Sequence, residues 1–185
     1  MARVGLSADR VVAEAEMLAD EVGLANLTLA ALAVRLGVQP PSLYKHIAGQ
    51  DALHRTIAVR AGAELAEVMR DAAVGRAGGD AVRAIAHAYR RWAHAHPGRY
   101  PATLAAPSPD DAEALAVAAR ALEVLRQALL GLDLAGDDEI DAIRTLRSGL
   151  HGFVSLEAAG GFGLPVDIDR SFDRLVDALL SSLER

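Results

Sequence analysis

The chain of 185 residues contains no cysteine and few aromatic residues, which make up only 4% of it. The lack of thiols excludes disulfides, thiol catalysis and cysteine-ligated metal sites, and it agrees with a reducing compartment. With so few aromatics, the core must be drawn mainly from Leu, Ala, Val and Ile among the 52% of hydrophobic residues. At helical spacing this composition predicts closely packed helices with enough apolar surface to bury a core.

Long hydrophobic runs and an excess of positive charge are also missing. No run approaches the roughly 18 apolar residues that span a bilayer, and the first residues, MARVGLSADR, lack the apolar region of a signal peptide. We therefore expect a cytoplasmic protein with no membrane partner. Because the formal net charge is −6, phosphate would repel the chain as a whole, and any contact with DNA must be local.

One segment stands out from this acidic background. Residues 28–50 contain Arg35, Lys45 and His46 but no Asp or Glu, although the chain is acidic on both sides of them. A local gap in the negative charge is where a contact with DNA is expected.

Capping residues and apolar spacing predict three helices at the start of the chain. Ser, Thr and Gln serve as N-caps, and glycines end the first two helices. In the first helix, Val11, Ala15, Leu18 and Val22 recur at steps of three and four residues and predict one buried face. The predicted boundaries are Ser7 to Gly23, Thr28 to Gly37, and Gln39 to about Ile47.

Helical spacing continues to the end of the chain, with no alternating strand pattern. The further helices are expected up to about Val74, over Asp80–His96, over Tyr100–Ala106, from Ser108 to Leu130, from Asp137 onward, and around Phe172–Leu183. The predicted fold is all-α with about nine helices: an N-terminal three-helix helix-turn-helix domain and a C-terminal helical bundle. The expected division is 1–50 for the helix-turn-helix domain, 51–74 for a connecting helix, and 75–185 for the bundle.

The third predicted helix has one buried and one open face. Leu43 and Ile47 lie four residues apart and point inward, which leaves the residues between and before them exposed. A helix of this size is about 12 Å long and matches the width of the DNA major groove. The alternative is a plain helical hairpin within an all-α bundle. An exposed face that holds Tyr, Lys and His without any carboxylate favours contact with DNA.

The segment LTLAALAVRLGVQPPSLYKHIAGQDAL resembles the DNA-binding signature of the tetracycline-repressor-like (TetR) family. The segment departs from the signature in two respects: Ile47 replaces a more usual aromatic residue, and Gln50 and Asp51 stand where the fourth helix often begins with a lysine. The resemblance implies a phosphate contact for Thr28, base contacts for Gln39, Pro41 and Ser42, and phosphate or thymine-methyl contacts for Tyr44, Lys45 and His46.

The later segments AYRRWAHAHPGRYPATL and LHGFVSLEAAGGFG are similar to the ligand-binding domain of the WHG subgroup of this family, with Leu150 in place of its tryptophan. This resemblance implies a small-molecule pocket and a homodimer formed by the last two helices. The alternative is that the same residues are ordinary core and interface residues. The candidate ligand-binding residues are Tyr89, Trp92, His96, Tyr100, Leu104, Leu122, Leu150 and His151. Arg90 and Arg91 are expected to be solvated, with contact of one of them to an acidic ligand as the alternative.

No constellation of residues predicts an enzyme, a cofactor or a metal site. The histidines at 87, 94, 96 and 151 lack the four-residue spacing of paired helical ligands. The GGFG segment does not follow a strand, so it fails as a dinucleotide-binding fingerprint. We expect a homodimeric repressor that a small lipophilic ligand releases from a palindromic operator in double-stranded DNA. The alternative is an all-helical small-molecule carrier or adaptor that does not bind DNA.

Overall fold

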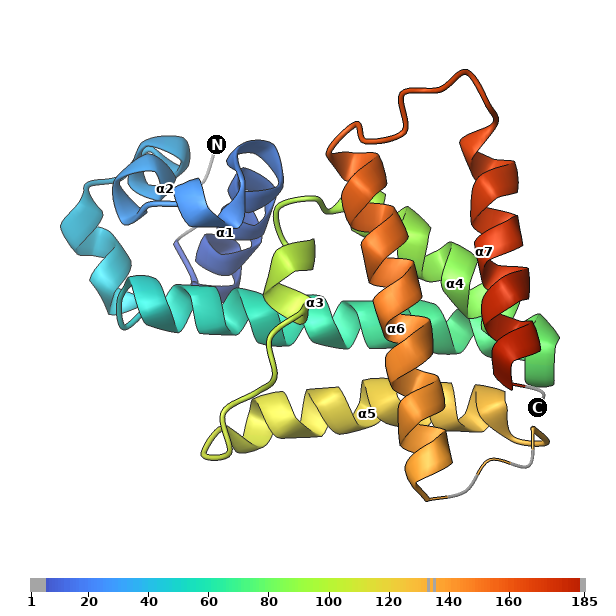
Figure 1. The fold of residues 1–185 in the computed structure, drawn as a ribbon. Coiled ribbons are helices and arrows are strands. Elements are labelled where there is room, and N and C mark those ends of the chain that lie inside the picture. The colour runs from blue at the N-terminus through green and yellow to red at the C-terminus, as the bar shows by residue number, and fades with distance from the viewer. Residues whose placement is uncertain (1–5, 133, 135, 184–185) are drawn as a thin grey trace. The chain divides into compact units, whose positions relative to one another are not determined.

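The computed structural model describes residues 6–132, 134 and 136–183. These residues form helices and no strand, which confirms the predicted all-α fold (Figure 1). The α-helices are α1 (Ala8–Val22), α2 (Leu29–Leu36), α3 (Gln50–Ala73), α4 (Gly78–Ala95), α5 (Ala112–Leu129), α6 (Asp137–Ala158) and α7 (Ile168–Leu183). Short 3₁₀ helices are η1 (Leu24–Asn26), η2 (Pro40–Lys45) and η3 (Tyr100–Thr103).

The contacts divide the chain into two compact units. Unit 1 comprises Met1–Gly62 and His96–Leu115, and unit 2 comprises Ala63–Ala95 and Ala116–Arg185. Helices α3 and α5 are therefore divided: each contributes one part to unit 1 and the other part to unit 2. The connecting helix expected over 51–74 is divided between the units, and residues after α4 return to the N-terminal unit.

The caps of unit 1 lie where the sequence predicted them. The Ser7 hydroxyl accepts a hydrogen bond from the Arg10 N–H at 3.3 Å, and the Thr28 hydroxyl accepts one from the Ala31 N–H at 3.2 Å. Gly37 ends α2 with φ +67°, a left-handed conformation that favours glycine. These caps fix where α1 and α2 begin and where α2 ends.

The core of unit 1 joins α1 and α2 to η2 and to the first part of α3. Val22 is the exception to the predicted buried face of α1, since it is exposed at the helix end. The side chains that are fully buried in this core include Val11, Leu27, Leu32, Leu43, Leu53 and Ile57. The buried side of the helix-turn-helix thus packs against both α1 and α3.

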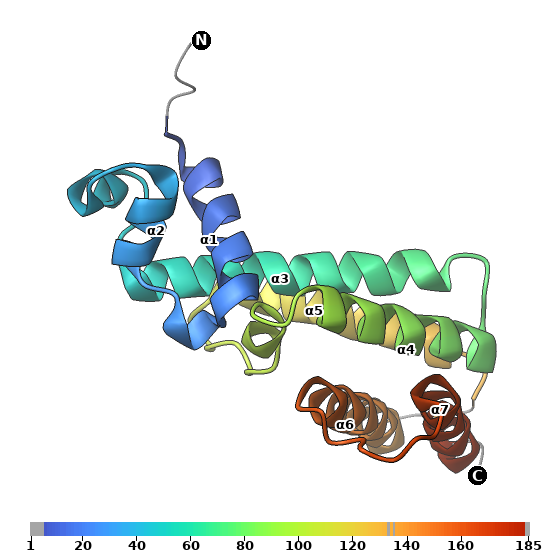
Figure 2. The ribbon, with the colours of Figure 1, turned by 90° about the horizontal axis from the view of Figure 1, so that it is seen from above.

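Unit 2 is built around α4, which contacts both α6 and α7. Helices α6 and α7 lie side by side, as Figures 1 and 2 show from two directions. Phe172 of α7 is completely buried, and Gly149 of α6 allows the Leu179 side chain to approach closely. None of the described helices has both the length and the apolar character needed to cross a membrane.

The prediction that Arg90 is solvated is wrong. Its guanidinium donates two hydrogen bonds to the Glu157 carboxylate, at 2.8 and 2.5 Å, and also contacts Asp169 at 2.8 Å. The same group lies over the ring of Phe172, 4.8 Å from its centroid. Arg90 is only 12% exposed, and its ion pairs join α4 to α6 and α7 inside unit 2. Arg91 is exposed, as expected.

Candidate nucleic-acid interface

The predicted third helix is a short 3₁₀ helix rather than an α-helix. The Ser42 N–H donates to the Gln39 carbonyl at 2.9 Å, which is the three-residue step of a 3₁₀ helix. Pro40 and Pro41 have no N–H, so the first donor available in this segment is that of Ser42. His46 follows η2 as its C-cap. The helix is shorter than predicted, but its buried side is correct, since Leu43 is 0% and Ile47 9% exposed.

The opposite side of this segment is open to solvent. Tyr44 is 62% exposed, Lys45 is exposed, and His46 and Ser42 are half-buried. Thr28, Gln39 and Pro41 are also exposed. We call these seven residues the η2 surface. They carry donors and no carboxylate, so the surface suits an anionic partner.

Arg35 does not belong to the η2 surface, although it lies in the acid-free segment. Its guanidinium donates to Glu14 at 3.0 Å and to Glu21 at 2.7 Å, both on α1. These two hydrogen bonds raise the pKa of Arg35 above its usual range. Arg35 therefore fastens α2 to α1, and Lys45 is left as the permanent cation of the surface.

Gln50 holds the surface in place from the start of α3. Its side-chain amide donates a hydrogen bond to the Leu27 carbonyl, directly before Thr28, and lies 2.8 Å from Nε2 of His54. Where many family members have a lysine, this chain has a residue that binds its own backbone. The sequence showed Gln50 only as a departure from the family signature, because the carbonyl that it binds is 23 residues away.

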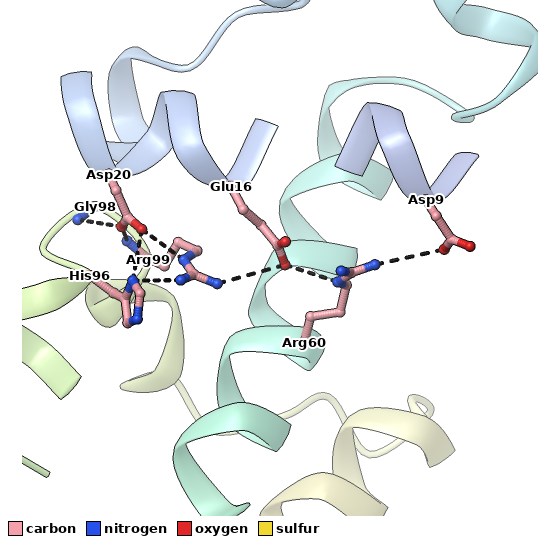
Figure 3. Close-up of polar contacts among 7 residues, drawn as sticks. All are labelled: Asp9, Glu16, Asp20, Arg60, His96, Gly98 and Arg99. Atoms are coloured by element: carbon pink, nitrogen blue, oxygen red, sulfur yellow. Dashed lines mark hydrogen bonds and ion pairs between the residues drawn. The ribbon is translucent and has the colours of Figure 1, made fainter. Parts of the chain in front are cut away.

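A second polar cluster in unit 1 holds α1 against the residues that follow α4 (Figure 3). The Asp20 carboxylate accepts hydrogen bonds from the backbone N–H groups of Gly98 and Arg99, at 3.1 and 2.9 Å. It also accepts from Nε of Arg99 at 2.8 Å, and Nδ1 of His96 lies 3.1 Å away. One carboxylate on α1 thus gathers four groups of the segment 96–99.

The cluster continues along α1 toward its N-terminus (Figure 3). Arg99 lies 4.0 Å from the Glu16 carboxylate, which accepts a hydrogen bond from Nε of Arg60 at 2.9 Å. Glu16 and Arg99 are both buried, at 8% exposed each. Buried charges are stable only when they are paired, so this arrangement fixes α1 to both α3 and the segment after α4.

Arg55 forms a third ionic contact within unit 1, from α3 to the start of α5. Its guanidinium donates to Asp111 at 2.5 and 2.6 Å and to Glu113 at 2.9 Å. These bonds lower the pKa of Asp111 to about 2. Asp111 also accepts from the Ala114 N–H and caps α5, so this helix begins later than the predicted Ser108.

The eight candidate ligand-binding residues are divided between the units. Tyr89, Trp92 and Leu150 are buried in unit 2, His151 contacts Ser155 there, and Leu122 is exposed. His96, Tyr100 and Leu104 belong to unit 1, where His96 takes part in the Asp20 cluster. The assignment of these residues to a ligand therefore remains a prediction.

Unit 2 contains a cavity of about 320 Å³ that sequence reasoning did not foresee. It is lined by Ala63, Ala66 and Ala73 of α3 and by Val124 of α5, with charged side chains that include Arg120. None of the eight candidate residues lines it. Small side chains at three to seven residue steps along α3 leave this space, a pattern that the sequence alone does not distinguish from ordinary helix packing.

The described residues contain no group of three or more His, Cys, Asp or Glu side chains placed to hold a metal ion. His87 and His94 instead contact carboxylates within unit 2. His87 lies 3.1 Å from Asp173, and His94 lies 2.7 Å from Glu157. Both histidines thus contribute to the packing of α4 against α6 and α7.

A helix pair that interlocks on its buried side, with a glycine-led turn and an exposed, carboxylate-free face, has the features of a helix-turn-helix DNA-binding protein. Comparison with known proteins identifies the family. Residues 11–57 match the model of the bacterial regulatory proteins of the tetR family, and residues 82–179 match that of the tetracyclin repressor-like C-terminal domain. The chain belongs to the TetR family of transcriptional regulators, which are DNA-binding proteins and not enzymes.

Individual relatives cover almost the whole chain. It is 36% identical to the HTH-type transcriptional regulator Rv0681 of Mycobacterium tuberculosis, over 97% of this chain and 83% of the relative. It is 35% identical to the regulator YobS of Bacillus subtilis, over 98% of this chain and 94% of the relative. A crystal structure of a TetR variant from Acinetobacter baumannii in complex with minocycline matches with a TM-score of 0.70 and 25% identity, over 98% of both chains.

Proposed function

We propose that this regulator is a homodimeric repressor that binds a palindromic operator and is released from it by a small lipophilic ligand. The observation that carries the proposal is the η2 surface. Tyr44 and Lys45 are exposed to solvent, while the adjacent Leu43 is fully buried in the core of unit 1. Donors held on a rigid support, without a nearby acid, suit the phosphates and base edges of a duplex.

The proposed contacts are those that the resemblance to the TetR signature implies for the residues of the η2 surface. Thr28 and Lys45 contact phosphates, and Tyr44 and His46 contact phosphates or thymine methyl groups. Gln39, Pro41 and Ser42, at the start of η2, approach the base edges. The Thr28 hydroxyl accepts from Ala31, which leaves its O–H free to donate to a phosphate oxygen.

We propose that dimerisation uses α6 and α7. Both helices lie largely within the matched C-terminal domain, and α6 leaves Ile140 exposed, where a second subunit would cover it. A two-fold dimer presents two recognition elements about 34–36 Å apart, one turn of DNA, and therefore selects a palindrome.

The ligand part of the proposal rests on unit 2. The cavity of about 320 Å³ between α3 and α5 is at the lower end of the volumes that small-molecule sites have, roughly 300–1,000 Å³. The alanine and valine side chains of its lining, which lie beside charged ones such as Arg120, suit the apolar part of a ligand. Minocycline in the complex of the Acinetobacter relative supports ligand binding as a property to test in this chain.

Selection of bound sites from random duplex DNA tests the proposed function. The purified chain is expected to enrich a palindromic consensus whose half-sites are about one helical turn apart. The selection is then repeated with lipophilic compounds, which should reduce recovery of the same consensus if they are effectors. Enrichment of no sequence would favour the carrier or adaptor alternative.

Tyr44→Ala is expected to weaken binding to the selected operator about tenfold, because the variant loses a donor and an apolar ring at the DNA surface. A gel mobility-shift titration measures the affinity, and sedimentation measures the dimer. The dimer should be unchanged, since Tyr44 is exposed and outside the core. Tyr44→Phe is the matched variant, and it separates the hydroxyl from the ring. Loss of the dimer in Tyr44→Ala would contradict the assignment.

Lys45→Ala is expected to make the salt dependence of DNA binding shallower by about one unit in the slope of log K against log salt, because one phosphate contact is lost. Affinity is measured at several salt concentrations on the same duplex. Arg91→Ala provides the control, since Arg91 is exposed on α4 and lies outside the η2 surface. Equal slopes for wild type and Lys45→Ala would show that Lys45 does not contact a phosphate.

A further inference from the structure

Lys45 is the only lysine of the chain. The basic residues number 19, and the other 18 are arginines. The two side chains differ in chemistry as well as in shape, because an amine can be acylated by activated carboxyl compounds, whereas a guanidinium retains its charge. A modification specific for side-chain amines would therefore reach one position of this protein.

Many of the arginines have carboxylate partners, whereas Lys45 has none among the described residues. At least nine of them contact carboxylates: Arg35, Arg55, Arg60, Arg70, Arg83, Arg90, Arg99, Arg126 and Arg144. Within the described part of the chain, the Lys45 ammonium forms no such ion pair. Because Arg35 is bound to Glu14 and Glu21, Lys45 is the uncommitted permanent cation between Thr28 and Gln50.

We propose that Lys45 is an acylation site for acyl phosphates and that its modification releases the protein from DNA. In the reaction, the deprotonated Nζ attacks the acyl carbon and forms an amide bond. The bond between the acyl carbon and the phosphate oxygen breaks, inorganic phosphate leaves with the electron pair, and water or phosphate takes the proton lost by the nitrogen. No further reactant is required.

The η2 surface explains why the donor should be an acyl phosphate. This step rests on the proposed function. A surface that binds DNA phosphates through Tyr44, Thr28 and His46 would also bind the phosphoryl group of an acyl phosphate. Binding there brings its acyl carbon to the one amine of the surface. A bound duplex would occupy the same donors and protect Lys45.

The consequence for DNA binding follows from the charge of the surface. An amide at Lys45 removes its permanent positive charge and adds a neutral acyl group on the side that faces the duplex. In a chain with a net charge of −6, no excess of positive charge elsewhere compensates for this loss. One modification per subunit is therefore sufficient to weaken binding.

The test treats the purified full chain with acetyl phosphate and, separately, with acetic anhydride, which has no phosphoryl group. Peptide mass spectrometry measures acetylation of Lys45 relative to the α-amine of the same chain. We expect the ratio of Lys45 to α-amine to be several-fold higher with acetyl phosphate, and to fall when duplex DNA or inorganic phosphate is added. An equal ratio with both reagents, or no protection by DNA, would overturn the proposal.

DNA affinity before and after acetyl phosphate treatment gives the second readout. We expect treated wild type to bind DNA about tenfold more weakly than untreated wild type, and untreated Lys45→Ala to bind as weakly as treated wild type. The DNA affinity of Lys45→Arg should be the same before and after treatment. Acetylation of Lys45 with unchanged affinity would refute the regulatory role. If untreated Lys45→Ala binds like wild type, the phosphate contact of the proposed function is wrong. If Lys45→Ala weakens DNA binding but acetyl phosphate treatment of wild type does not, the acylation proposal fails and the phosphate contact stands.

Discussion

Gly98→Ala is expected to lower the free energy of unfolding by about 3 kcal/mol, at the upper end of what overpacking costs. A Cβ atom at residue 98 would lie 1.7 Å from the carbonyl oxygen of Ala19 on α1, and 2.7 Å from the backbone nitrogen of Asp20. Backbone atoms of a helix cannot rotate away as a side chain can. The variant must therefore separate α1 from segment 96–99 and stretch the hydrogen bonds that Asp20 accepts.

Urea unfolding followed by circular dichroism measures this loss, and hydrogen exchange of α1 should rise in the same variant. Gly163→Ala is the matched control, because a Cβ at Gly163 meets no atom within 4 Å and its φ is not in the left-handed region. We expect its stability to stay within about 0.5 kcal/mol of wild type. An unfolding midpoint of Gly98→Ala equal to that of Gly163→Ala would refute the close contact with Ala19.

Glu157→Gln is expected to lower the free energy of unfolding by about 2 kcal/mol. The substitution keeps the shape of the side chain but leaves Arg90, which is 12% exposed, without its principal counter-charge. Asp169 still contacts Arg90, but Asp169 is largely exposed and supports the charge less. Removal of one partner from a largely buried pair destabilises because the other charge stays desolvated.

The pH dependence of stability gives an independent check on Glu157. Hydrogen bonds from Arg90 lower the pKa of Glu157 to about 2, from an ordinary value of 4.5. A carboxylate with a lowered pKa stabilises the fold above its unfolded pKa, and this contribution is lost as the pH falls from about 4.5 toward 2. The wild-type stability should therefore decline more steeply over this range than that of Glu157→Gln.

Asp141→Asn on the same helix is the control for Glu157→Gln. Asp141 pairs with Arg144, but both side chains are more than 70% exposed, so the pair is expected to contribute little. A loss in Asp141→Asn as large as that in Glu157→Gln would indicate a general effect of charge on α6 rather than a specific ion pair with Arg90.

The parts of the fold that could be predicted are those specified by neighbouring residues. The caps at Ser7 and Thr28 and the left-handed Gly37 depend on contacts within four residues, and all three lie as predicted. The buried side of η2 also followed from a local spacing, that of Leu43 and Ile47. The DNA-facing candidates were accessible to sequence reasoning for the same reason, although their contacts with DNA remain predictions.

The features that escaped prediction depend on residues far apart in the sequence. Arg90 meets Glu157 across 67 positions, and Gly98 and Arg99 meet Asp20 across 78 and 79. Arg90 and Arg91 are adjacent but differ in burial, and the carboxylate that pairs with Arg90 lies too far along the chain for local spacing to identify it. The cavity lined by α3 and α5 is likewise a product of helix packing, which periodicity does not specify.

Trp92 is the chain's only tryptophan, and it is 4% exposed on α4 within unit 2. Its intrinsic fluorescence therefore reports on the surroundings of one buried side chain of α4, while the circular dichroism reports on the helices of both units. A difference between the two melting curves would show that the surroundings of Trp92 unfold in a separate step from the other helices. The native protein thus contains its own fluorescent probe, and no dye or added chromophore is needed to follow its unfolding.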